Sequence, residues 1–181
     1  MVKYCVVNEC PIDFEACATA AHEGHLEILK YLRKEVKAPW EPDTTDSAAE
    51  RGHLHILEYL VERKYDKYDV LACRFAAVNG YLDCLKYLHE IAKAPWDKEV
   101  VRKAYKTATE PRLFPTAREV FYEEDTPEED LIECIQYLLD NDCPLPSRWR
   151  YEDGELRVPE SESGSSSDSE LEPDSDSEFW Y

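Results

Sequence analysis

Hydrophobic and polar positions recur with a fixed spacing along the chain. Segments that begin at Ala20, Ala48 and Ala76 start 28 residues apart and read AAHEGHLEILKYL, AAERGHLHILEYL and AAVNGYLDCLKYL. After the shared glycine of each segment, the apolar residues lie at helical spacing. A constant period in the range of 20 to 50 residues is typical of repeat architectures. The pattern therefore predicts stacked units rather than a single irregular core.

Each unit is predicted to contain two short helices. Asp13 and Asp69 stand where a side-chain oxygen can cap the first helix. A pair of alanines follows and lets that helix pack closely, and Gly24, Gly52 and Gly80 end it where a left-handed backbone is needed. One helix pair cannot bury its apolar stripe alone, but stacked pairs form a continuous core.

The phase divides the chain into a repeat array, residues 1–146, and a tail, residues 147–181. We expect an all-α solenoid of helix-turn-helix repeats followed by a disordered acidic C-terminal tail. Within the array we assign a half repeat and four repeats, at 1–13, 14–42, 43–69, 70–97 and 98–146. An insertion near 109–129 lengthens the last repeat, and Tyr105 replaces its second alanine. We therefore expect the first helix of that repeat to be distorted.

The A-A-x-x-G-H-L core resembles the ankyrin repeat family. The turns at Pro39-Trp40 and Pro95-Trp96 are similar to a variant of that repeat which ends in C-P-W-D/E. This resemblance implies an ankyrin-type α-solenoid whose first helices face a concave surface used to recognise proteins. The chain lacks the T-P-L-H opening, and its period is 28 residues rather than about 33. We therefore expect the long hairpin fingers of the family to be short or absent.

The charge of the chain narrows its possible partners. It has 40 acidic and 21 basic residues and a formal net charge of -19. Such a charge repels a nucleic-acid backbone, so we expect no nucleic-acid partner. We also expect no membrane partner, because the sequence has neither a long apolar stretch nor a signal-peptide core. These features favour a monomer in the cytoplasm or nucleus that binds a protein.

Cysteine and histidine first suggest a metal site, because Cys5, Cys10, Cys17, His22 and His25 are close in sequence. Repeat phase favours a different interpretation. Most of the cysteines share columns with Leu, Ile, Val or Thr in other repeats, and structural zinc needs short paired ligand spacings. We therefore expect no metal and no cofactor. The histidines that follow the glycines are predicted to hydrogen-bond the backbone, and the other histidines to lie at the surface.

No phosphate-binding glycine loop, nucleophile elbow or zinc-protease helix occurs in the sequence, so we predict that the protein is not an enzyme. The positions of the first helices that change character between repeats form a hypothetical protein-binding surface. The alternative is that they are exposed and vary freely. These positions are His22, Glu23, Asp46, Glu50, Arg51, Arg74, Val78, Asn79, Arg102 and Lys106.

The tail is dominated by Ser, Asp, Glu and Pro between Glu160 and Glu178, a composition that cannot offset the entropy of ordering. Four serines each precede an acidic residue by three positions, which resembles the target pattern of casein kinase 2, and phosphorylation would add negative charge. Solubility is the simpler explanation. The four candidate phosphorylation sites are Ser165, Ser167, Ser169 and Ser175.

Two functional alternatives remain open beside a protein-binding adaptor. The chain could be a structural or truncated member of a large repeat family with no specific partner, since Met1 falls inside a predicted second helix. It could also bind basic proteins through its acidic tail, in which case binding would be salt-sensitive and would depend on Val158 to Tyr181. The sequence names neither the partner nor the role of the terminal Phe179-Trp180-Tyr181.

Overall fold

The computed structural model describes residues 14–38, 42–63, 68–109 and 127–159. The predicted half repeat, the Trp40 turn, most of the insertion and the four candidate phosphorylation sites lie outside these ranges. The structure divides into two units, Met1–Pro146 and Ser147–Tyr181. The described residues are mostly helical. None of their helices combines the length and apolar character needed to cross a membrane.

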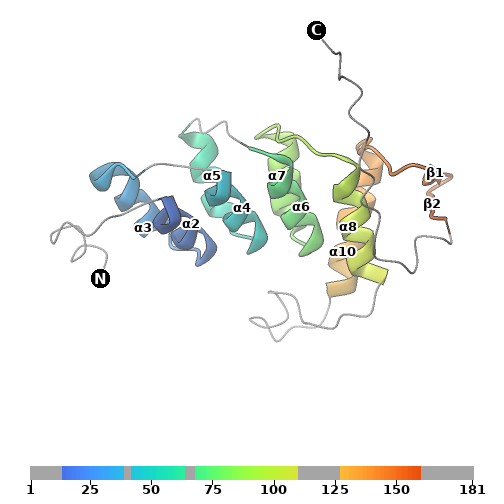
Figure 1. Ribbon diagram of the computed structural model, residues 1–181, viewed down its shortest axis with the longest axis horizontal. Coiled ribbons are helices and arrows are strands. Elements are labelled where there is room, and N and C mark those ends of the chain that lie inside the picture. Colours follow the sequence, from blue (N-terminus) through green and yellow to red (C-terminus); the bar gives the residue numbers. More distant parts are fainter. Residues whose placement is uncertain (1–13, 39–41, 64–67, 110–126, 160–181) are drawn as a thin grey trace, which may run out of the picture. The chain divides into compact units, whose positions relative to one another are not determined.

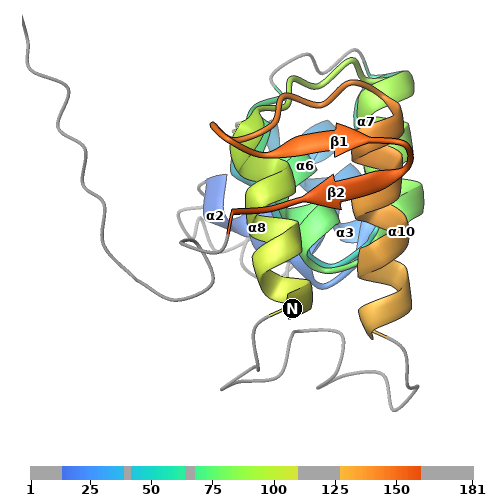
Figure 2. The same ribbon diagram turned by 90° about the vertical axis from the view of Figure 1, so that its right-hand side faces the viewer.

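Two layers of helices make up the first unit (Figures 1 and 2). The first helices of the repeats pack on one another in chain order, and the second helices lie beside them. We call these groups the first-helix layer and the second-helix layer. The first-helix layer contains α2 (Phe14–His22), α4 (Pro42–Glu50), α6 (Val70–Val78) and α8 (Lys98–Thr109). The second-helix layer contains α3 (Leu26–Tyr31), which continues into the π-helical segment η1 (Leu32–Val36), and α5 (Leu54–Glu62), α7 (Leu82–Glu90) and α10 (Pro127–Asp140).

The alanine columns explain how closely the first helices pack. Ala48, Ala49, Ala76, Ala77 and Ala104 are fully buried. A methyl side chain leaves little distance between helix backbones, so short helices of nine residues can still share a dense core. The predicted distortion of the first helix in repeat four is wrong, because α8 is a continuous helix of 12 residues. The half-buried Tyr105 is accommodated without breaking it.

The glycine prediction is confirmed by the backbone. Gly24, Gly52 and Gly80 have φ angles of +73°, +70° and +72°, which residues with a side chain rarely adopt. Each of these glycines also lies against a side chain of the following repeat, which is Asp130 for Gly80. A Cβ atom on Gly52 would lie 2.5 Å from the Tyr81 ring, and one on Gly24 would lie 2.8 Å from the His53 ring. Gly24 and Gly52 therefore serve both the turn and the stacking.

A second left-handed turn ends the second helices, and the repeat pattern did not predict it. Lys37, Lys93 and Asp142 have φ angles of 59°, 56° and 57°. The next residue in each case is a buried small side chain whose N–H returns to the end of the helix. Ala94 N donates to the Leu88 carbonyl at 2.9 Å, for example. Such caps satisfy helix carbonyl groups that would otherwise lack a donor.

The predicted boundary between residues 146 and 147 coincides with the division between the two units, but the first part of the tail has regular structure where disorder was expected. Strands β1 (Arg150–Glu152) and β2 (Glu155–Arg157) form an antiparallel hairpin (Figure 2). Asp153 and Gly154 connect them with φ angles of 54° and 81°. An Asp-Gly pair with two positive φ angles is a common two-residue hairpin turn. This local turn signal was present in the sequence, but the composition of the surrounding segment outweighed it.

Candidate functional site

The candidate protein-binding residues lie on the first-helix layer or on the turns that follow it, and their exposure differs strongly. Glu23, Arg102 and Lys106 are exposed, whereas most of the others are half-buried. Asp46 is the exception, with a relative exposure of 7%. The prediction that Asp46 belongs to an open surface is therefore corrected by the structure. Its repeat position faces the junction with the following repeat, which repeat phase alone does not reveal.

Repeats 1 and 2 are connected by a hydrogen-bonded group of predicted site residues. Arg51 Nε donates to His22 Nε2 at 2.8 Å, so this ring nitrogen carries no proton. His22 Nδ1 then donates to Glu23 Oε1 at 2.9 Å, and this bond lowers the pKa of the Glu23 carboxyl. Three neighbouring surface residues from two repeats thus have fixed relative positions.

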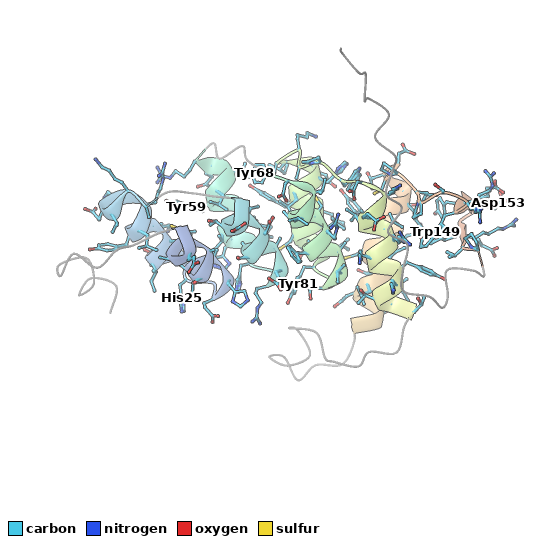
Figure 3. The ribbon with its side chains drawn as sticks, in the orientation of Figure 1. His25, Tyr59, Tyr68, Tyr81, Trp149 and Asp153 are labelled. Atoms are coloured by element: carbon cyan, nitrogen blue, oxygen red, sulfur yellow. The ribbon has the colours of Figure 1, made fainter. Side chains whose placement is uncertain are left out.

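The histidines that follow the glycines differ in role. His53 Nε2 donates to the His22 carbonyl of the preceding repeat at 3.0 Å, and burial lowers the pKa of its ring. His25 is exposed at the N-cap position of α3, where its side chain makes no capping hydrogen bond. Figure 3 shows His25 and Tyr81, which takes the place of histidine in repeat 3, on the same side of the array. The predicted backbone role is confirmed for His53, although its partner belongs to the neighbouring repeat.

Repeats 2 and 3 meet at a concentration of carboxyl groups. Asp43, Asp46 and Glu50 lie on one stripe of α4, at helical spacing. Asp69 caps α6, where its Oδ1 accepts the Leu71 N–H at 2.7 Å. Burial and the nearby charges of Asp69, Asp43 and Glu50 raise the pKa of Asp46 to about 7.

Repeats 3 and 4 meet at an ion pair instead. Arg74 occupies the position of Asp46 one repeat later, and Asp97 occupies the position of Asp69. Asp97 Oδ1 accepts the Glu99 N–H at 3.0 Å and thereby caps α8, while its Oδ2 lies 3.6 Å from Arg74 Nη2. The same two positions therefore hold opposite charges at this junction and like charges at the preceding one.

The remaining candidate residues lie along α6 and α8 or at the end of α6. Asn79 Nδ2 donates to the Phe75 carbonyl at 3.0 Å and closes the end of α6, while Val78 is half-buried beside it. Arg102 Nη1 lies 3.4 Å from Glu99 Oε1 on the surface of α8. Lys106 is exposed one turn farther along the same helix. The predicted residues thus form neighbouring groups along the layer rather than a single cluster.

Cysteine columns behave as the repeat phase predicted. Cys17, Cys73 and Cys134 are fully buried, and Cys84 is nearly so. Burial also raises the pKa of the Cys73 thiol to about 12, which favours the uncharged and unreactive form. Within the described ranges, no three His, Cys, Asp or Glu side chains are grouped so as to hold a metal ion.

A column of tyrosines lies in the second-helix layer, and its partners were not predicted from the sequence. Lys30 Nζ lies 5.8 Å from the centre of the Tyr59 ring, and Lys86 Nζ lies 5.8 Å from that of Tyr137. In both cases a lysine of one repeat covers the tyrosine of the next. At the junction of repeats 2 and 3, the position of these lysines holds Glu58. The signal was present in the sequence, because the lysines recur in phase.

Trp96 packs beside its turn. Its ring stacks on His89 with a centroid distance of 3.6 Å and an interplanar angle of 9°. Tyr137 completes the group with an edge-on contact to Trp96 at 6.3 Å, and its hydroxyl donates to Glu90 Oε1 at 2.9 Å. These contacts join repeats 3 and 4 on the side of the second helices.

Comparisons with known proteins agree with the repeat phase. Residues 45–89 match the family model described as ankyrin repeats (many copies). This segment runs from α4 into α7 and contains both Gly52 and Gly80. No curated protein and no solved structure matches the chain. Ankyrin repeats are in general modules for protein–protein interaction. Residues 45–89 are thus similar to ankyrin repeats, and the helix pairs on either side continue the same repeat pattern.

Proposed function

We propose that the protein is a non-enzymatic adaptor that binds a protein partner through the first-helix layer. One observation supports this proposal above the others. The buried alanine and leucine columns are nearly constant between repeats, whereas the surface positions above them differ in charge, size and polarity. A constant scaffold with a varied surface provides the chemical differences that specific recognition needs.

The surface also has partly fixed side chains. The group formed by His22, Glu23 and Arg51 and the pair formed by Arg74 and Asp97 are held by contacts within the array. Side chains that are already ordered lose less conformational entropy when a partner binds. This feature favours recognition over the alternative of exposed residues that vary freely.

Affinity capture from a native lysate tests the proposal. The intact chain is compared with a triple variant, Arg51→Ala, Asn79→Ala and Arg102→Ala, which alters three repeats but leaves the carboxyl groups between repeats 2 and 3 unchanged. A matched control carries Glu58→Ala, Asp83→Ala and Glu133→Ala, three exposed positions of the second-helix layer. Circular dichroism confirms that all chains remain helical.

We expect the intact chain and the control to retain the same protein, and the triple variant to lose it. If the triple variant captures the same proteins as the intact chain, the first-helix layer is not the binding surface. If deletion of residues 158–181 alone abolishes capture, binding through the acidic tail replaces the adaptor proposal.

A further inference from the structure

Among the residues that the structure describes, the position that holds Arg74 at the junction of repeats 3 and 4 holds Asp46 at the junction of repeats 2 and 3. Asp46 Oδ1 is buried and has no hydrogen-bond partner among the residues that the structure describes. Burying a carboxylate oxygen without a donor is costly, so such groups are normally paired. The residue is more than nine-tenths buried, with Asp69 and Glu50 half-buried and Asp43 exposed around it.

The neighbouring junction indicates which group fits. At the equivalent position, Arg74 brings a guanidinium to the cap residue Asp97, with 3.6 Å between Nη2 and Oδ2. Asp69 caps its helix in the same manner as Asp97, but it faces Asp46 instead of an arginine. A planar guanidinium offers five donors and pairs with two carboxylates more readily than a lysine ammonium does.

We propose that Asp46 and Asp69, with Asp43 and Glu50 at the approach, bind an arginine side chain of a protein partner. This inference rests on the proposed adaptor function and names one feature of the partner. The incoming guanidinium takes the place that Arg74 has at the next junction. It donates to Asp69 and to the unpaired oxygen of Asp46, and the net charge of -19 favours the approach of a cationic segment.

Proton exchange gives the proposal a specific signature. Burial and the neighbouring carboxylates favour the protonated form of Asp46. A guanidinium displaces that proton, which passes to the solvent, so binding strengthens as the proton becomes easier to remove.

Other ionisable groups near Asp46 are Asp43 and Glu50 on α4 and Asp69, Cys73 and Arg74 at α6, where Arg74 is already paired with Asp97. On the opposite side, α2 carries Glu15 and His22 near its two ends, with Glu23 after it. Because the pKa of Asp46 is about 7, linkage predicts that arginine affinity rises about tenfold between pH 6 and pH 8.

The experiment titrates the full chain with the peptide acetyl-Gly-Gly-Arg-Gly-Gly-amide and follows backbone amide shifts by NMR. Matched peptides carry lysine or citrulline at the central position. We expect the arginine peptide to shift the amides of Asp46, Asp69 and Leu71 and to bind more tightly than either analogue. Equal binding of the lysine peptide, or shifts spread over the acidic surface, would overturn the proposal.

Variants test whether the peptide binds at this site or is only attracted by the overall negative charge of the chain. Asp46→Asn and Asp69→Asn each remove one charge, and asparagine can still cap α6. We expect about tenfold or greater weakening, the size typical of losing a charge-assisted hydrogen bond, and loss of the pH dependence in Asp46→Asn. Asp83→Asn on α7 makes the same charge change at an exposed position and should bind normally. Equal weakening in all three variants would contradict a specific site.

Asp46→Arg supplies the guanidinium from within the chain. It should abolish binding of the arginine peptide and raise the thermal midpoint, because the introduced guanidinium would pair with Asp69 as Arg74 pairs with Asp97. Retained peptide binding in this folded variant would overturn the proposal. These outcomes are independent of lysate capture: if the capture variants lose their partner but no arginine peptide binds, the adaptor function stands and only the arginine site fails.

Discussion

Asp46 and Arg74 occupy the same position of successive repeats, but their environments differ in sign. After burial, Asp69 has the largest influence on the pKa of Asp46, whereas Arg74 Nη2 lies 3.6 Å from Asp97 Oδ2. Since Asp46 is buried next to a like charge, protonation stabilises it, whereas Arg74 is stabilised by its partner at any pH where Asp97 is ionised. The difference between Asp and Arg at one repeat position thus changes how the stability of a junction depends on pH.

Stability should therefore depend on pH through Asp46. Its folded pKa of about 7 exceeds the ordinary value of 3.8, so the folded chain retains a proton that the unfolded chain releases. This contribution is complete below about pH 4 and is lost as the pH rises through 7. At pH 8 we expect Asp46→Asn to be more stable by roughly 2 to 4 kcal/mol, since one pKa unit corresponds to about 1.4 kcal/mol.

Urea unfolding at pH 5 and pH 8, followed by circular dichroism, measures this difference. Glu58→Gln is the matched control, because Glu58 is exposed and should leave the pH profile unchanged. If Asp46→Asn stabilises the chain equally at pH 8 and at pH 5, Asp46 does not titrate in the folded chain over this range.

Gly52 combines a backbone requirement with a packing requirement. Gly52→Ala places a methyl group 2.5 Å from the Tyr81 ring and strains a φ angle of +70°. We expect a loss of roughly 2 to 4 kcal/mol in the free energy of unfolding. In a double-mutant cycle, Tyr81→Ala should relieve the packing part and leave the backbone part. Additive losses measured by urea unfolding would mean that the ring does not restrict residue 52.

At the scale of helices, the second-helix layer has an incomplete series of lysine–tyrosine contacts. Lys30 covers Tyr59 and Lys86 covers Tyr137, but Glu58 stands before Tyr87. Burial, Glu58 and Glu62 raise the pKa of the Tyr87 hydroxyl. Glu58→Lys should lay an ammonium group over this ring and stabilise the chain by about 0.5 to 1 kcal/mol. Thermal unfolding measures the gain, and Glu133→Lys on α10 gives the same charge change elsewhere. An equal gain in both variants would mean that the change in net charge, and not a contact with the Tyr87 ring, stabilises the chain.

Repeat phase predicted the helices, their glycine ends and the buried alanine and cysteine columns, because each depends on local spacing. It did not predict the burial of Asp46 or the pairing of Arg74 with Asp97, because both depend on which residue the next repeat brings to the junction. The hairpin at Asp153-Gly154 was missed for another reason: the composition of residues 147–181 as a whole outweighed a two-residue turn signal.

At the scale of the whole molecule, the net negative charge destabilises the folded array, whereas the contacts between repeats stabilise it. In a stacked array, stability comes from each repeat and from its contacts with the nearest neighbours. The described contacts between repeats include a junction that opposes like charges, and the chain carries a net charge of -19. Repulsion among exposed carboxylates raises the free energy of the compact state, and dissolved ions screen it.

Salt should therefore stabilise this protein. Raising sodium chloride from about 0.05 M to 0.5 M shortens the Debye length below about 5 Å and weakens repulsion between exposed carboxylates more than contacts in the buried core. We expect a gain on the order of 1 kcal/mol, or roughly 2 to 4 °C in the thermal midpoint for a chain of this size. Potassium chloride at equal ionic strength should act alike, because screening does not depend on the cation. A midpoint that falls with salt would mean that attractive ion pairs such as Arg74 with Asp97 outweigh the repulsion, and the net charge would then not limit the stability of the array.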